Sequence, residues 1–140
     1  MGDTETRAND EGEATAALTP YDLIGGADAV RRLAERLYDI MDADPQAAGI
    51  RAMHGDDLRP IKDSLFEFLS AWLGGPQDYF QRADRPCIRS AHRSFAIGPA
   101  ERDQWLMCMN RALSETEVPE PVRKLLEQPL FRMADMLRSR

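Results

Sequence analysis

The stretch RPCIRSAHRSFAIGPAERDQWLMCM, residues 85–109, decides how the rest of the chain is interpreted. Within it, Gly98-Pro99 followed by Glu101 is typical of a helix start, because proline suits the first turn and a glutamate can return to the capping residue. Apolar residues then recur every three or four positions, which predicts an amphipathic helix. They are Trp105, Cys108, Met109, Ala112 and Leu113.

Helical signals continue on both sides of this stretch. Upstream, Thr19-Pro20 has the form of an N-cap with proline at the first helical position, and the apolar spacing predicts helices over about 27–43 and from near Asp56-Asp57 to Gly74-Gly75. Downstream, Pro119 and Pro121 bracket a break, and a last helix follows in which Pro129 should cause a kink. Residues 76–86 are expected to be irregular. Because no alternation typical of strands exceeds four residues, we expect an all-α fold.

Length and charge bound the function. A chain of 140 residues makes one domain. Its first 20 residues hold five acidic residues against Arg7 alone, so we expect a disordered acidic tail over 1–19 and a folded domain over 20–140. A net charge of −6 argues against non-specific nucleic-acid binding and against a polybasic membrane anchor, so we expect neither a nucleic-acid nor a membrane partner. Without an apolar run long enough to span a membrane, we expect a cytoplasmic protein in which both cysteines are thiols.

Few side chains in this sequence carry recognisable chemistry. The chain has no glycine-rich phosphate loop, no CxxC and no HExxH pair. The candidates are therefore His54, His92, Tyr38 and Trp105. His92, at the end of a short segment and followed by apolar residues, suits a ligand to haem iron, since neutral imidazole coordinates iron and apolar neighbours exclude water. The alternative from the residues alone is an ordinary surface or core histidine.

The order of several motifs along the chain favours the interpretation of His92 as a haem ligand. They are YDLIGG (21–26), LYDIMDADP (37–45), DDL (56–58), FLSAWLGGP (68–76), RPCIRSAH (85–92) and FAIGPAERDQWLMCM (95–109), followed by an amphipathic helix. In this order they resemble the group II truncated haemoglobins, and the resemblance covers about residues 19–140. It implies a truncated globin fold, a two-over-two helical sandwich around haem b.

The resemblance also implies roles for individual residues. His92 falls at the family's proximal histidine, which is the protein's bond to haem iron. Tyr38 and Trp105 fall at distal positions whose O–H and N–H donate hydrogen bonds to a bound ligand. His54 falls in the turn before the third helix, where it would pack against haem. Its imidazole acting as a sixth iron ligand is the alternative.

Further positions are expected to surround the haem. Ile61 and Leu65 fall at two distal positions four residues apart, hence on one helical face. Arg89 matches a family arginine that pairs with a haem propionate, with Arg93 as the alternative. Where many relatives have arginine before the proximal histidine and proline two positions after it, this chain has Ala91 and Ser94. The remaining haem-packing candidates are Phe66, Leu69, Phe95, Ile97 and Met109.

The function implied is reversible binding of dioxygen, nitric oxide and carbon monoxide. Two alternatives stay open at this point. The same site would support nitric oxide dioxygenation or peroxide reduction with an external reductase, since the chain has no flavin or nicotinamide motif of its own. A haemless helical interaction module is the third reading. The sequence is compatible with a monomer or a homodimer.

Overall fold

The structure is a computed structural model that describes residues 18–82 and 88–140. The predicted acidic tail lies outside the described residues except for its last two, Leu18 and Thr19. Over the described ranges the chain forms helices and no strand, so the all-α prediction is confirmed. The elements are α2 (Pro20–Ile24), α3 (Gly26–Ala43), the 3-10 turn η1 (Pro45–Ala47), α4 (Ala48–Arg51), α5 (Arg59–Trp72), α6 (Asp78–Gln81), α7 (Ile88–His92), α8 (Pro99–Glu115) and α9 (Glu120–Met136).

The helix starts follow the capping signals in the sequence. Thr19 and Asp22 form a reciprocal capping box at α2, with Pro20 in its first turn. Gly98 caps α8, and the Glu101 carboxylate accepts a hydrogen bond from the Gly98 N–H at 2.7 Å. These bonds satisfy main-chain N–H groups that the helix itself leaves without acceptors.

Three details of the sequence prediction are wrong. The helix expected from Asp56-Asp57 begins at Arg59, because the Asp57 carboxylate accepts hydrogen bonds from both the main chain and the side chain of Arg59 and so holds a turn there. Residues 78–81, expected to be irregular, form α6. Pro121 lies in the first turn of α9 and not in a break before it, a position that tolerates proline.

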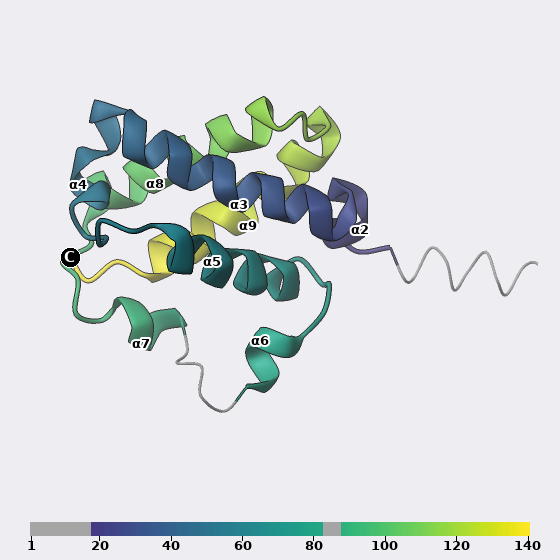
Figure 1. The fold of residues 1–140 in the computed structure, drawn as a ribbon, viewed down its shortest axis with the longest axis horizontal. Coiled ribbons are helices and arrows are strands. Elements are labelled where there is room, and N and C mark those ends of the chain that lie inside the picture. The colour runs from purple at the N-terminus through teal and green to yellow at the C-terminus, as the bar shows by residue number, and fades with distance from the viewer. Residues whose placement is uncertain (1–17, 83–87) are drawn as a thin grey trace, which may run out of the picture.

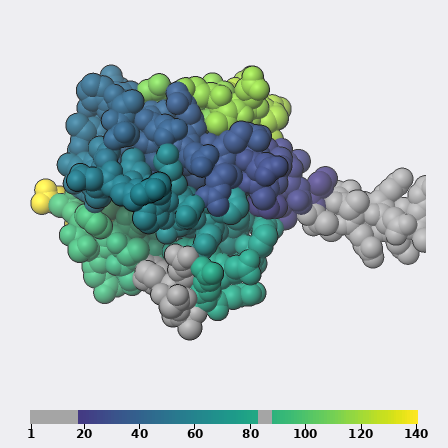
Figure 2. All heavy atoms as spheres, in the orientation of Figure 1, coloured from purple at the N-terminus to yellow at the C-terminus, as the bar shows by residue number. Residues whose placement is uncertain are grey.

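Four long helices form two layers. α3 runs antiparallel to α5, and α8 runs antiparallel to α9 in the layer behind (Figure 1). α3 also packs on α8, so that it contacts both layers. The short helices α6 and α7 lie beside this core, both on the α5 side (Figures 1 and 2).

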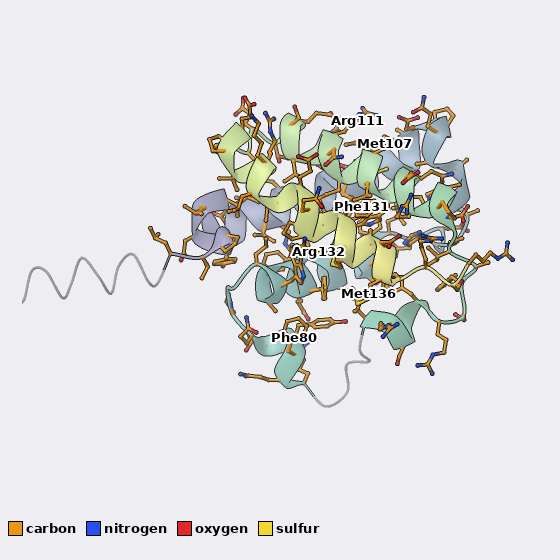
Figure 3. All side chains as sticks on the ribbon, turned by 180° about the vertical axis from the view of Figure 1, so that it is seen from behind. Phe80, Met107, Arg111, Phe131, Arg132 and Met136 are labelled. Atoms are coloured by element: carbon orange, nitrogen blue, oxygen red, sulfur yellow. The ribbon has the colours of Figure 1, made fainter. Side chains whose placement is uncertain are left out.

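The core lies where α3 meets α5 and α8. Side chains that are fully buried here include Val30, Leu33 and Leu37 of α3, Leu69 of α5, and Met109 and Leu113 of α8. Each buried side chain of this size contributes about 1.5–3 kcal/mol of favourable transfer free energy. The outer face of α9 is less apolar and carries Phe131, Arg132 and Met136 (Figure 3). The Arg102 guanidinium covers the Phe131 ring at 5.0 Å.

The turn after α5 depends on two glycines. Gly74 has a φ of +94°, which favours glycine. Gly75 lies so close to the Tyr21 ring of α2 that an added Cβ would sit 2.5 Å from a ring carbon. The Tyr21 N–H also donates to the Leu73 carbonyl at 3.0 Å, so α2 and this turn cannot easily move apart.

Gly75→Ala is therefore expected to destabilise the protein by about 1–3 kcal/mol, since overpacking forces the ring or the backbone to shift. Urea unfolding followed by circular dichroism measures this loss. Gly55→Ala is the matched control, because nothing lies within 4 Å of its added Cβ. Equal midpoints for the two variants would contradict the expected clash.

Among the described helices, none combines the length and the apolar character that crossing a membrane requires.

Candidate functional site

His92 ends the short helix α7, and its ring is fixed by a main-chain hydrogen bond. Nδ1 lies 2.7 Å from the Ile88 carbonyl oxygen. Because a carbonyl only accepts, Nδ1 carries the proton in the neutral ring and Nε2 keeps its lone pair. A metal-binding histidine has this arrangement, in which one ring nitrogen donates to a main-chain carbonyl and the other binds the metal.

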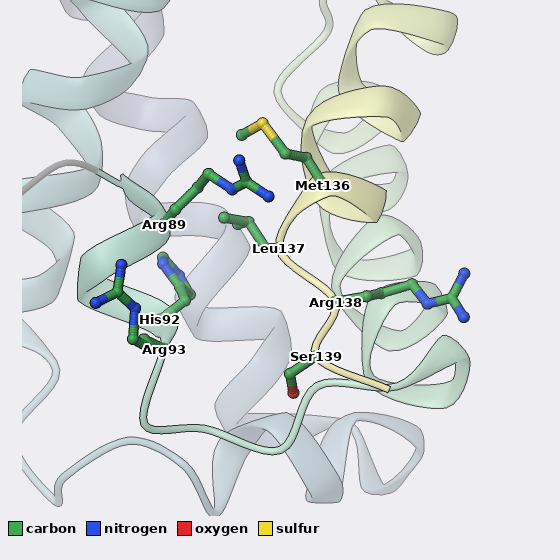
Figure 4. A pocket seen from close by; sticks show the side chains of 7 residues that line it. All are labelled: Arg89, His92, Arg93, Met136, Leu137, Arg138 and Ser139. Carbon is green, nitrogen blue, oxygen red and sulfur yellow. The ribbon is translucent and has the colours of Figure 1, made fainter.

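A cavity of about 320 Å³ lies against His92. It is lined from α7 and the following residue by Arg89, His92 and Arg93, and from the end of α9 onward by Met136, Leu137, Arg138 and Ser139 (Figure 4). Its volume falls in the range typical of small-molecule and cofactor sites.

The cavity rim is positively charged. Arg89 and Arg93 are exposed and form no ion pair with any part of the chain that the structure describes. Arg138 is paired with Asp135 at 3.1 Å, and its side chain points away from His92 (Figure 4). Two unpaired guanidinium groups beside an imidazole suit a cofactor that carries carboxylates.

His54 has the same local geometry as His92. Its Nδ1 donates to the Ile50 carbonyl at 2.8 Å, so its neutral form also leaves Nε2 with a lone pair. The ring meets the Tyr38 ring edge to face, with centroids 5.5 Å apart. Burial lowers the pKa of His54, the hydrogen bond to Ile50 opposes this, and the charges of Arg51 and His92 lower it further.

The turn that carries His54 is tied down from both sides. Arg51 donates to the main-chain carbonyls of His54, Gly55 and Asp56, and its Nε donates to Asp42 of α3 at 2.8 Å. On the other side, the Ile50 N–H donates to Gln104 Oε1 of α8 at 3.1 Å. Ile50 therefore links α8 to the His54 ring through its own N–H and carbonyl.

Tyr38 and Trp105 carry hydrogen-bond donors that have no acceptor in the part of the chain that the structure describes. Tyr38 is 4% exposed, and burial raises its pKa well above the ordinary value, so the phenol keeps its proton. In residues 18–82 and 88–140, neither its hydroxyl nor the Trp105 indole N–H has a hydrogen-bond partner. In these ranges, Ser70 Oγ is the side-chain oxygen or nitrogen that is both fully enclosed by protein and without a hydrogen-bond partner. Because the Tyr38 hydroxyl also lacks a partner, it is not fully enclosed.

The other predicted site residues differ in how deeply they are buried. Ile61, Leu65 and Trp105 are partly buried and pack against the core, while Arg89 and Phe95 are exposed and Ile97 is half-buried. Leu69 and Met109 are fully buried within the core. Phe66 lies on the α3 side of α5, where the Arg31 guanidinium covers its ring at 4.0 Å.

Sequence reasoning missed three side chains that hold this region together. Arg51 and Gln104 fix the turn around His54, and Ser139 contacts the linker after His92. The spacing from Arg51 to His54 suggests a local contact, but nothing in the sequence links Gln104 to Ile50 or Ser139 to Ile97. The bond between Ile50 and Gln104 spans 54 positions of the sequence, and the bond between Ile97 and Ser139 spans 42.

Comparisons with known proteins agree with this geometry. The family described as Bacterial-like globin matches residues 19–139. A group 2 truncated haemoglobin of Bacillus subtilis, YjbI, is 27% identical over 107 residues, covering 76% of this chain and 78% of that protein.

Solved structures give the same result. The group II 2-on-2 haemoglobin of Agrobacterium tumefaciens is 38% identical with a TM-score of 0.81, over 87% of this chain and 95% of that one. The cold-adapted truncated haemoglobin of Pseudoalteromonas haloplanktis is 36% identical with a TM-score of 0.82, over 88% and 99%. The chain belongs to the bacterial-like globin family, and its relatives in sequence and structure are group II truncated haemoglobins.

Proposed function

We propose that His92 would hold haem b in this protein, and that the haem would bind dioxygen, nitric oxide or carbon monoxide. Membership of the globin family implies haem. The observation that carries the proposal is that His92, whose Nδ1 donates to the Ile88 carbonyl and which therefore keeps a lone pair on Nε2, also lines the cavity. Localisation in the cytoplasm is part of the same proposal.

The residues present fit haem on three counts. His92 offers a nitrogen ligand, and the exposed Arg89 and Arg93 offer charge partners for carboxylates. Tyr38 and Trp105 offer donors for which residues 18–82 and 88–140 provide no acceptor. When bound, haem supplies an iron with an open coordination position for a diatomic ligand. The protein would supply a nitrogen ligand from His92 and hydrogen-bond donors from Tyr38 and Trp105.

The tautomer of His54 determines which side chains can donate a hydrogen bond to a bound ligand. His54 Nδ1–H already donates to Ile50, so the neutral His54 ring has only an acceptor left at Nε2. It cannot donate to a ligand, and it serves to hold Tyr38 through the edge-to-face contact. Tyr38 and Trp105 are then the donors that act on a polar diatomic ligand, and hydrogen bonds to charged groups are worth about 1.5–3 kcal/mol each.

The direct test is a titration of the haem-free protein with ferric haem, followed by absorption spectroscopy. We expect a protein-bound Soret band that saturates at one haem per chain. After reduction, addition of carbon monoxide should shift this band, which reports an open position on the iron. A titration without saturation, or a reduced spectrum unchanged by carbon monoxide, would contradict the proposal.

The same haem-loaded protein can be used to distinguish a redox enzyme from a protein that only binds ligands. If the protein works as an enzyme with an external reductase, the ferric form should be reduced repeatedly by that donor while nitric oxide or peroxide is consumed. A protein that only binds ligands should stall in the ferric state after one turnover.

A further inference from the structure

The helix that carries His92 has little support from the other helices. α7 is five residues long, none of them buried, and it packs only slightly against its neighbours among the described elements. A helix this short does not hold its place through its own stability. The position of His92 must therefore depend on what fixes the segments next to α7.

Residues 138–140 fix the linker on one side of α7. The Ser139 N–H and the Arg140 N–H both donate to the Ile97 carbonyl, at 2.8 and 3.2 Å. The Ser139 side chain adds two more bonds. The Ile97 N–H donates to Ser139 Oγ at 3.0 Å, and the Ser139 hydroxyl donates to the Phe95 carbonyl at 3.1 Å. Every bond in this set joins the end of α9 to the linker that follows His92.

The linker passes this restraint directly to His92. The Phe95 N–H donates to the His92 carbonyl at 3.0 Å. Ser139 Oγ is thus two hydrogen bonds from the main chain of His92, through Phe95. Ser139 also lines the cavity beside His92, where its side chain faces the linker leaving α7 (Figure 4).

The residues on either side of Ser139 are hydrogen-bonded to each other and to the long helices. Arg138 donates to the Arg140 main-chain oxygen at 2.8 Å and to Asp135 at 3.1 Å, and Asp135 also accepts from Arg102 of α8 at 2.8 Å. The two arginines hold the pKa of Asp135 below its ordinary value, which keeps the carboxylate charged. The clasp formed by residues 138–140 is therefore tied to α8 through Arg102 and to α9 through Asp135.

We propose that Ser139 is a positioning residue, whose hydroxyl fixes the linker after α7 and so sets how His92 meets the haem iron. This inference rests on the proposed function, because it concerns the bond between His92 and haem. Among the described residues, the Ser139 hydroxyl is the one group that both accepts a hydrogen bond from the linker and donates one to it. Its removal leaves the Ile97 N–H and the Phe95 carbonyl without their partner.

The test compares Ser139→Ala with Ser139→Thr, which keeps the hydroxyl. Ser94→Ala is the matched control, because Ser94 lies in the same linker and has no hydrogen bond in the described structure. Three readouts are taken: amide hydrogen exchange at Ile97 in the haem-free protein, the rate of haem transfer to an apoglobin acceptor, and the iron–histidine stretching band of the reduced protein.

We expect Ser139→Ala to speed exchange at Ile97 and haem release, each by about tenfold, at the lower end of effects typical of groups that orient a metal ligand. The iron–histidine band should shift or broaden. Ser139→Thr and Ser94→Ala should behave like the wild type in all three.

Two outcomes would overturn the inference. If Ser139→Ala speeds exchange at Ile97 but leaves haem release and the iron–histidine band unchanged, the clasp does not position His92. If none of the three readouts changes, the hydroxyl has no such role. A wild-type protein that takes up no haem refutes the proposed function itself, and this is seen before any variant is compared.

Discussion

Tyr38→Phe should release dioxygen about 10- to 150-fold faster than the wild-type protein. The substitution removes one oxygen atom and leaves a ring of the same shape in a buried position. A hydrogen bond to a charged group is worth about 1.5–3 kcal/mol, which corresponds to this range of rates. Since the Tyr38 hydroxyl has no acceptor among the described residues, its donor is available to a ligand. Stopped-flow replacement of dioxygen by carbon monoxide measures the dissociation rate.

Two comparisons make this result specific. Tyr21→Phe is the same chemical change in α2, where the ring packs on Gly75, and it should leave the dissociation rate unchanged. Carbon monoxide carries less charge than dioxygen when bound, so its dissociation from the Tyr38 variant should change much less. Equal effects on both gases would indicate an opened pocket and would contradict a lost hydrogen bond.

The long helices were predictable from sequence because their apolar spacing extends over several turns. The stripe of α3, from Val30 to Met41, is buried as its periodicity predicts. α6 was missed because four residues do not give a periodic pattern. It forms where Tyr79 and Phe80 pack edge to face on Phe68 of α5, with ring centroids 5.5 and 6.0 Å from that ring. This contact depends on the tertiary fold.

The candidate site was predictable only in part, for a similar reason. Ile88 and His92 are four residues apart, so a helix places the His92 ring near the Ile88 carbonyl. The contact between Tyr38 and His54 depends instead on how the turn after α4 folds back toward α3. The clasp depends on the end of α9 reaching the linker after α7. No local pattern encodes either arrangement, because each is set by packing between distant segments.

His92→Gly should weaken haem binding by more than about 100-fold, which exceeds the usual cost of removing a group that merely orients a metal ligand. Glycine leaves a space where the imidazole stood, so added imidazole should enter it and restore much of the lost affinity. Haem titrations with and without imidazole, followed at the Soret band, measure both effects. Rescue by imidazole separates a lost iron ligand from a misfolded chain, which a small molecule would not repair.

His54 provides the control for this experiment, because the local geometry alone does not distinguish the two histidines. Both donate Nδ1–H to the carbonyl four residues earlier, and both keep a lone pair on Nε2. Their surroundings differ: His92 lines the 320 Å³ cavity, whereas Arg51 ties the His54 turn to α3 and the His54 ring packs on Tyr38. His54→Ala should therefore keep haem and instead speed dioxygen release, since Tyr38 loses the ring that holds it. If haem were lost from His54→Ala and kept by His92→Gly, the two roles would have to be exchanged.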